Sequence, residues 1–348
     1  MTKGWPAESN QTIDLGVPAS RTGRQFQWFC RSAQEAVEQI ERVRAGSTPA
    51  LTFLCSLPVD SAPMGSNSSA WDVAHRAAER ANATIRPLRW ADTDAVMAVI
   101  ASVWGPDALP EALLRAFQHA GSCLLGAEHG GEFLGFVLGF LGSAEGLHIH
   151  SHMTAVRPEA QSAGLGYALK LAQRAAALDD GIDEIRWTYD PLIARNAQFN
   201  LHRLGAVATA YFPNFYGEMP DLVNRGDRSD RFEVRWRLRS KWVHHVLEVG
   251  PPGHQLPKYR SILDAEGPRD AARPVETGEP PLNSVVATIP LDYPALRTRR
   301  PDLGEAWREA SGRAFAACFE EGLVARTFFV DTYHFTVPNE PELPERPQ

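Results

Sequence analysis

Hydrophobic positions along the chain recur with two different periods, and segments of each period follow one another in order. Apolar residues at helical spacing predict helices over 71–82, from about Asp92, over 166–178 and over 194–204. Alternating or continuous apolar runs predict strands over 83–89, 122–129, 132–142, 147–156, 184–189 and 231–238. The order strand, turn, helix, strand, helix after residue 147 predicts α/β architecture, with the run 231–238 closing the sheet.

The flanking segments are less regular than this core. A helical pattern over 32–45 and a strand-like run over 50–57 precede a stretch rich in turn-forming residues. Proline, glycine and charge dominate from 249 to 282, and a short strand, a helix over about 302–321 and two further strand-like runs come after. These shifts predict an N-terminal extension that is partly flexible (1–69), a main domain (70–240), a linker or long loop (241–282) and a small C-terminal α/β subdomain packing on the core (283–348).

Composition narrows the class of protein without indicating its chemistry. The chain has 348 residues, 44% of them hydrophobic and 22% charged, as in ordinary globular proteins. Its formal net charge of -7 argues against a general nucleic-acid binder, which needs concentrated Lys and Arg. The four cysteines show no CxxC spacing, so neither a disulfide framework nor a zinc site is indicated. Without a leader-like N-terminus or a long apolar run, we expect a soluble, cytoplasmic protein that binds no membrane; a homodimer is left open.

The stretch that indicates chemistry is Val156–Ala168, VRPEAQSAGLGYA. It ends a predicted strand and leads through a QxxGxG turn directly into a predicted helix. A helix N-terminus has unpaired N–H groups and partial positive charge, so it can receive a pyrophosphate without a basic side chain. A Rossmann turn needs GxGxxG and fits only loosely, and no Gly-Lys-Ser/Thr follows for a Walker loop. A plain strand-to-helix turn is the remaining alternative.

The pattern VxPxxQxxGxG, the preceding hairpin and the segments EIRWTYDP and NAQFNLHRLGA resemble the GNAT acyltransferase superfamily. More narrowly, HSHMTAV, FYGEM and NRGDRSDRFEVRWRL are similar to an uncharacterised branch of predicted acetyltransferases. The resemblance covers about 85–238. It implies the GNAT acyl-CoA N-acyltransferase fold, a mixed and mostly antiparallel sheet flanked by helices, here with N- and C-terminal extensions, and acetyl-CoA or another acyl-CoA as co-substrate.

The resemblance also assigns the residues that would bind the coenzyme. The strand before the glycine turn would splay from its neighbour and bind the pantetheine arm through Met153, Thr154, Ala155 and Val156. The pyrophosphate loop would comprise Gln161, Ser162, Ala163, Gly164, Leu165 and Gly166. An arginine often found in this loop is replaced here by Ser162 and Ala163. Asn196 lies near the position where an asparagine commonly contacts the pantetheine arm.

Three histidines at period two, His148, His150 and His152, stand on the strand where a general base is needed. Strand alternation would put all three on one face. An imidazole can accept a proton near neutral pH, and by the resemblance His150 stands where histone-acetylating members place a glutamate base, so we predict His150, then His152, as catalytic. Structural histidines are the alternative. A metal is not expected, because three such residues spread over roughly 13 Å.

The leaving thiolate and the acceptor amine are less clearly marked. Superfamily members often use a tyrosine acid at a position that corresponds here to Leu201, so we name Tyr216 as the candidate acid, with Tyr211 and His202 as substitutes. Arg195 could clamp a carboxylate, which suits an amino-acid acceptor. Capping of a helix is the alternative for Asp190. The predicted substrate-binding residues are His148, Tyr189, Asp190, Arg195 and Asn200.

Two functions are therefore compared. The first is an enzyme that moves an acyl group, acetyl by default and succinyl or longer as an option, from acyl-CoA to the amine of a small metabolite such as an amino acid. The alternative is a catalytically silent domain of this type that binds a CoA derivative or a protein partner, which the missing tyrosine favours. Protein acetylation is a weaker third option.

Overall fold

A computed structural model of the protein describes residues 68–161, 164–219, 221, 226–251, 260–277 and 283–338. These residues belong to one unit of the chain, Met64–Gln348. The predictions for 32–45 and 50–57, for the N-terminal extension and for Ser162 and Ala163 lie outside the described residues.

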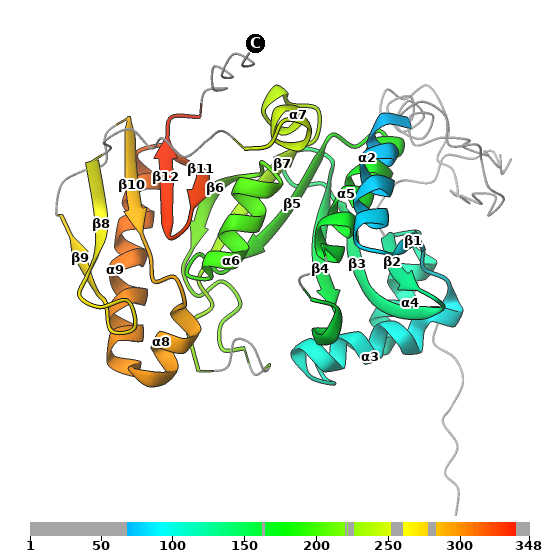
Figure 1. Cartoon of the computed structure of the whole chain (residues 1–348), viewed down its shortest axis with the longest axis horizontal. Coiled ribbons are helices and arrows are strands. Elements are labelled where there is room, and N and C mark those ends of the chain that lie inside the picture. The colour runs from blue at the N-terminus through cyan, green and yellow to red at the C-terminus, as the bar shows by residue number, and fades with distance from the viewer. Residues whose placement is uncertain are drawn as a thin grey trace, which may run out of the picture. The chain divides into compact units, whose positions relative to one another are not determined.

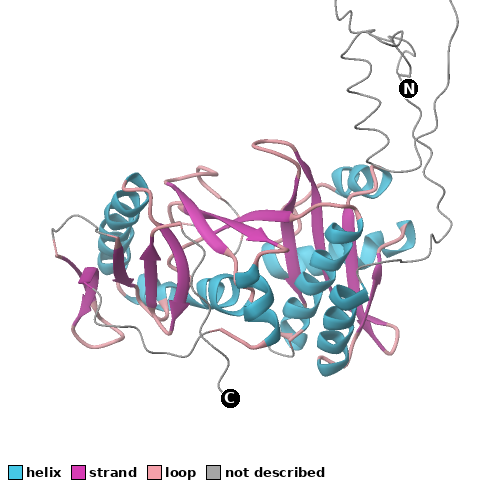
Figure 2. Cartoon of the chain, turned by 90° about the horizontal axis from the view of Figure 1, so that it is seen from above, coloured by secondary structure: helices cyan, strands magenta, loops and turns pink. Residues whose placement is uncertain are grey.

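The strands of the described residues form one sheet of twelve, in the order β1-β2-β3-β4-β5-β7-β6-β11-β12-β10-β8-β9 (Figures 1 and 2). Only β4 with β5 and β8 with β10 pair in parallel. The sheet is thus mixed and mostly antiparallel, as predicted. The strands are β1 Thr84–Pro87, β2 Cys123–His129, β3 Glu132–Gly142, β4 His148–Val156, β5 Glu184–Tyr189, β6 Val207–Phe212, β7 Arg231–Arg237, β8 Arg260–Glu266, β9 Arg273–Glu276, β10 Ser284–Thr288, β11 Val324–Phe329 and β12 Thr332–Thr336.

Helices cover both faces of the first half of this sheet. Helix α5 packs on α2 and on strands β2 to β4, and its apolar residues share a core with Val137 and Ile149. Helices α3 and α4 cover the opposite face, where Phe136 and Leu138 are buried. The helices are α2 Ser68–Arg80, α3 Thr93–Trp104, α4 Glu111–His119, α5 Leu165–Asp179, α6 Ala194–Ala197, the π-helix η3 Gln198–Arg203, α7 Lys241–Glu248, α8 Tyr293–Arg299 and α9 Pro301–Glu320, with short 3-10 turns η1 Trp90–Asp92 and η2 Pro158–Ala160.

The structure differs from the sequence expectation mainly in the second half. The range 241–282, expected to be a linker or long loop, contains α7, β8 and β9. Helix α7 forms despite its Pro- and Gly-rich surroundings because Ser240 caps it by accepting a hydrogen bond from Val243 N, and Trp242 is buried. Strand β7 does not close the sheet: it lies between β5 and β6. The pairing of β6 with β11, at Ala208 and Ala325, then joins residues 283–338 to the same sheet.

Candidate functional site

The parallel pairing of β4 with β5 is short. It comprises Ile149 with Ile185 and His150 with Arg186, and among the described residues it does not extend to the remainder of either strand. The backbone of β4 after His150 therefore has no strand partner on the β5 side. Unpaired strand amides and carbonyls need other hydrogen-bonding groups, from water or from a ligand.

A cavity of about 1100 Å³ lies at this opening. Most of the residues singled out from the sequence line it: His150, His152, Met153, Thr154, Val156, Gly166, Tyr189, Asp190, Arg195, Asn196, Asn200 and Tyr216. Five of the others in the described part of the chain are not in its lining: His148, Ala155, Gln161, Gly164 and Leu165. Ala155 and Leu165 are instead buried in the two cores on either side of the sheet.

The three histidines of β4 do not share one environment. The pairing with β3 skips His152, because Leu138 pairs with Met153 and Gly139 with Ser151. This β-bulge reverses the alternation, so a strict period of two no longer holds beyond it. His148, which was predicted to bind substrate, is buried and does not line the cavity. Its Nδ1 lies 2.9 Å from the carbonyl oxygen of Gly146.

His150 is held among aromatic rings. Its ring centroid lies 5.1 Å from that of Phe140 and 6.3 Å from that of His152. Burial lowers the pKa of His150 to about 4, and the positive charges of His152, His148 and Lys170 add to the effect. Burial also lowers the pKa of His152. Both imidazoles are therefore neutral near pH 7 and have a nitrogen that can accept a proton.

The glycine turn leads into α5 through a left-handed residue. Gly164 is the N-cap of the helix, with a φ of 87° that side chains disfavour. A Cβ built on Gly166 would meet no atom within 4 Å, so its backbone is approachable from the cavity. The first N–H groups of an α-helix have no partner within the helix. This end of α5 therefore offers donors and positive potential to an anion.

Lys170 is a cavity residue that the sequence analysis did not predict. It lies one turn after Gly166 on α5, is 3% exposed and lines the cavity. Its Nζ donates hydrogen bonds to Ser151 Oγ at 3.0 Å and to Gln173 Oε1 at 2.8 Å, and lies 3.8 Å from the centroid of Trp187. Burial lowers the pKa of Lys170 to about 7. In an amphipathic helix a lysine is ordinarily assigned to the solvent-exposed face, so the helical pattern did not predict that Lys170 is buried.

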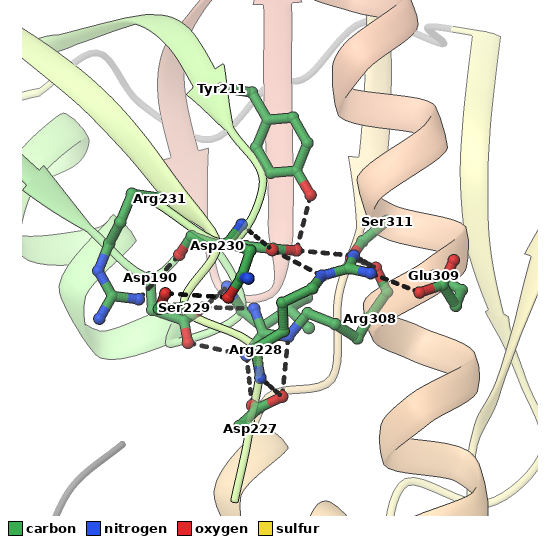
Figure 3. A network of polar contacts seen from close by, with 12 residues as sticks. Asp190, Tyr211, Asp227, Arg228, Ser229, Asp230, Arg231, Arg308, Glu309 and Ser311 are labelled. Atoms are coloured by element: carbon green, nitrogen blue, oxygen red, sulfur yellow. Dashed lines mark hydrogen bonds and ion pairs between the residues drawn. The ribbon is translucent and has the colours of Figure 1, made fainter. Parts of the chain in front are cut away.

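A network of carboxylates and guanidinium groups lies at one side of the cavity, and Figure 3 shows its contacts. Arg308 of α9, 3% exposed, donates from Nη1 and Nη2 to the two oxygens of Asp190, at 2.9 and 2.8 Å, and also binds Asp227. Asp227 is paired with Arg297 at 2.8 Å, and Arg297, Tyr293 and Pro294 line the cavity. Helix α8 thus contributes to the site, although sequence analysis saw no chemistry in the C-terminal segment.

Several predicted substrate-binding side chains are engaged within the protein. Asp190 accepts hydrogen bonds from Leu192 N and from Arg308, so both of its carboxylate oxygens have a partner. The bond from the backbone N–H of Leu192 is of the kind that the capping alternative predicted. Tyr189 OH lies 3.2 Å from Tyr333 OH. Asn200 Oδ1 accepts a hydrogen bond from Trp187 Nε1 at 3.3 Å. These three side chains line the cavity while making these contacts within the protein.

Arg195 and Tyr216 are accessible to a ligand. The exposed Arg195 lines the cavity and has no ion-pair partner among the described residues. Tyr216 is 46% exposed, and its OH lies 3.1 Å from Thr188 Oγ1. Of the substitutes for the missing tyrosine, Tyr211 is engaged, because its OH donates to Asp230 at 2.6 Å. Leu201 is fully buried and cannot act as an acid.

Comparisons with known proteins gave one family-model match and a set of similar solved structures. Residues 84–205 match the model of the acetyltransferase (GNAT) family. No curated protein matches the chain. Similar solved structures include the ribosomal-protein-S18-alanine N-acetyltransferase from Escherichia coli (16% identity, 50% of this chain and 99% of that one, TM-score 0.39). Others are yncA from Salmonella typhimurium with its cofactor acetyl-CoA (21%, 46% and 95%, TM-score 0.38) and Arabidopsis thaliana Naa50 with a bisubstrate analogue (14%, 44% and 97%, TM-score 0.36).

No helix in the described ranges is long and apolar enough to cross a membrane. Within the same ranges, no group of His, Cys, Asp or Glu side chains is arranged to hold a metal ion.

Proposed function

We propose that the protein transfers an acyl group from acyl-CoA to the amine of a small metabolite such as an amino acid, in keeping with the match of residues 84–205 to the model of the acetyltransferase (GNAT) family. One observation carries the proposal. The opening between β4 and β5, the N-terminus of α5 and a neutral imidazole border the same cavity. That combination suits an anionic, extended thioester whose carbonyl must be attacked by an amine.

The residues present fit the coenzyme. Met153, Thr154 and Val156 would bind the pantetheine arm through their unpaired strand backbone, and Asn196 lines the same cavity. The N–H groups at the start of α5 would receive the pyrophosphate, where the helix dipole favours negative charge. When bound, the coenzyme supplies an activated acyl group as a thioester.

His150 is proposed as the general base. As the amine attacks, a nitrogen–carbon bond forms, the carbon–sulfur bond breaks with its electron pair going to sulfur, and the amine proton passes to the imidazole. With a pKa of about 4, His150 holds the proton only briefly. The exposed His152 beside it provides a route to solvent. Tyr216 is proposed to return a proton to the sulfur, so that amide and free thiol are the products.

Arg195 is proposed to bind the carboxylate of the acceptor. A guanidinium without an ion-pair partner among the described residues can form two parallel hydrogen bonds to a carboxylate. The exposed Glu218 at the cavity would attract the ammonium form of an amine. An amino acid carries both groups, which is why it is the acceptor class we favour.

The proposal is tested by a thiol-release assay with a panel of acyl-CoAs and amines. We expect His150→Gln to lower kcat/KM by about 10²–10⁴, the range of general base catalysis, with little change in acetyl-CoA binding. His129→Gln, at the exposed end of β2, is the matched control and should leave turnover unchanged.

Undiminished turnover by His150→Gln would exclude His150 as the base and make His152→Gln the next variant. If acetyl-CoA binds and none of the amines is acylated, the alternative of a silent coenzyme-binding domain replaces the enzyme.

A further inference from the structure

Lys170 differs from two other buried cations near the site, Arg308 and Arg186, in its pairing. Arg308 is paired with Asp190 and Asp227, and Arg186 with Glu184. Lys170 has no carboxylate within ion-pair distance among the described residues. A buried charge without a counter-ion is costly, and such groups are concentrated at functional sites.

The titratable neighbours of Lys170 do not compensate for its charge. Burial raises the pKa of Cys123, on β2, to about 12, so this side chain remains a neutral thiol. His150, on β4, is neutral because burial lowers its pKa to about 4. The remaining contacts are the hydroxyl of Ser151, the amide of Gln173 and the rings of Trp187 and Trp236. The site is thus favourable for a negative charge that the protein itself does not supply.

The ammonium group also retains a hydrogen-bond donor. A lysine ammonium has three N–H groups. Two of them are used by Ser151 Oγ and Gln173 Oε1. Lys170 lines the cavity, and beyond the ring of Trp187 no acceptor for the third N–H is present among the described residues.

The position of Lys170 indicates which part of a ligand it would meet. Ser151 follows the last β4 residue paired with β5, and Trp187 follows the corresponding residue of β5. Nζ therefore lies at the inner end of the opening between the two strands. Arg195, our candidate for the acceptor carboxylate, comes from a different element, α6. The two cations are suited to two different anionic groups.

We propose that Lys170 recognises the carboxylate at the far end of a short dicarboxylic acyl group, of the malonyl or succinyl type, carried by acyl-CoA. This inference rests on the proposed function and names its donor class. During transfer the thioester carbon–sulfur bond breaks and the amide bond forms, while the distal carboxylate is unchanged and only anchors the acyl group.

The test is isothermal titration of the full chain with CoA, acetyl-CoA and succinyl-CoA. A charged hydrogen bond in a buried site corresponds to roughly a 10- to 100-fold preference for succinyl-CoA over acetyl-CoA. In Lys170→Met this preference should disappear, while the Kd values of CoA and acetyl-CoA remain within about threefold. Lys241→Met, at the exposed start of α7, is the matched control and should retain the preference.

Proton uptake on ligand binding gives a second readout. If Lys170 had only a structural role, proton uptake would not differ between succinyl-CoA and acetyl-CoA. With a pKa of about 7, Lys170 is mostly neutral at pH 8. A bound carboxylate would raise this pKa, so succinyl-CoA should bind with uptake of close to one proton and acetyl-CoA with much less. Titrations in buffers of different ionisation enthalpy measure the difference, and Lys170→Gln, which keeps a polar group, should abolish it.

The outcomes separate the two proposals. Equal affinity of the wild-type protein for acetyl-CoA and succinyl-CoA, or a preference that survives in folded Lys170→Met, overturns the role of Lys170 and leaves the acyltransferase intact. Absence of binding by all three coenzyme forms overturns the proposed function, and the inference with it. Circular dichroism on each variant establishes that it is folded.

Discussion

Replacing Arg308 by methionine is expected to lower the free energy of unfolding by roughly 3–5 kcal/mol. The substitution would leave Asp190 and Asp227, whose side chains are 15% and 12% exposed, close together without their shared guanidinium. Removing one partner of a buried ion pair is costly because the remaining charges stay desolvated. Urea unfolding followed by circular dichroism measures the change, with an unaltered m-value indicating the same cooperative transition.

Arg313→Met provides the comparison on the same helix. Arg313 pairs with Glu276 at 2.7 Å, but its side chain is 59% exposed. Exposed ion pairs contribute about 0–1 kcal/mol, so this variant should unfold near the wild-type midpoint. If both variants shift the urea midpoint equally, the buried ion pairs of Arg308 contribute no more to the free energy of unfolding than an exposed pair does.

Lys170→Met is expected to stabilise the free protein at pH 7 by roughly 1–3 kcal/mol. In the folded state Lys170 has a pKa of about 7 against an ordinary value of 10.5. Below pH 7 both states are protonated and the full cost of the buried charge, on the order of 5 kcal/mol, is present. Methionine removes this cost, but Ser151 and Gln173 then lose a hydrogen-bond partner, which offsets part of the gain.

The pH dependence identifies the cause. Between pH 7 and about 10 the unfolded chain binds more protons at Lys170 than the folded protein does, so wild-type stability should rise with pH. In Lys170→Met that contribution to the rise should be absent, whereas Lys241→Met should follow the wild type. Parallel profiles of Lys170→Met and wild type in urea unfolding at pH 7 and 9.5 would show that Lys170 is equally protonated in both states.

The patterns that predicted the first half of the sheet involve residues that are close together in the sequence. The hairpin of β2 and β3 is defined by Gly130 and Gly131 between two apolar runs, and α5 by its apolar period after a glycine turn. The family resemblance then placed the cavity-lining stretch of β4. These elements could be predicted because period, turn and helix start all indicated the same structure.

The remainder depended on contacts that no local pattern contains. Arg308 and Asp190 are separated by 118 positions, so nothing near either residue predicts their pairing. The bulge at His152 inserts one residue into β4, which itself has no glycine there, and it changed what alternation had predicted for that strand. Lys170 is buried because its side chain lies against the sheet, where Nζ contacts Ser151, Trp187 and Trp236, and only the packing of α5 on the sheet reveals this.

The location of Arg308 also affects how the protein is made. The matched family segment, 84–205, is synthesised first, whereas α8 and α9 come from residues 293–320. A nascent chain that ends before α8 has Asp190 and Asp227 without Arg308 and Arg297, and it lacks the cavity-lining residues Tyr293, Pro294 and Arg297. We therefore expect competence for acceptor binding to arise only after α8 and α9 have been synthesised, so that the family segment expressed alone would not reproduce the activity of the longer chain.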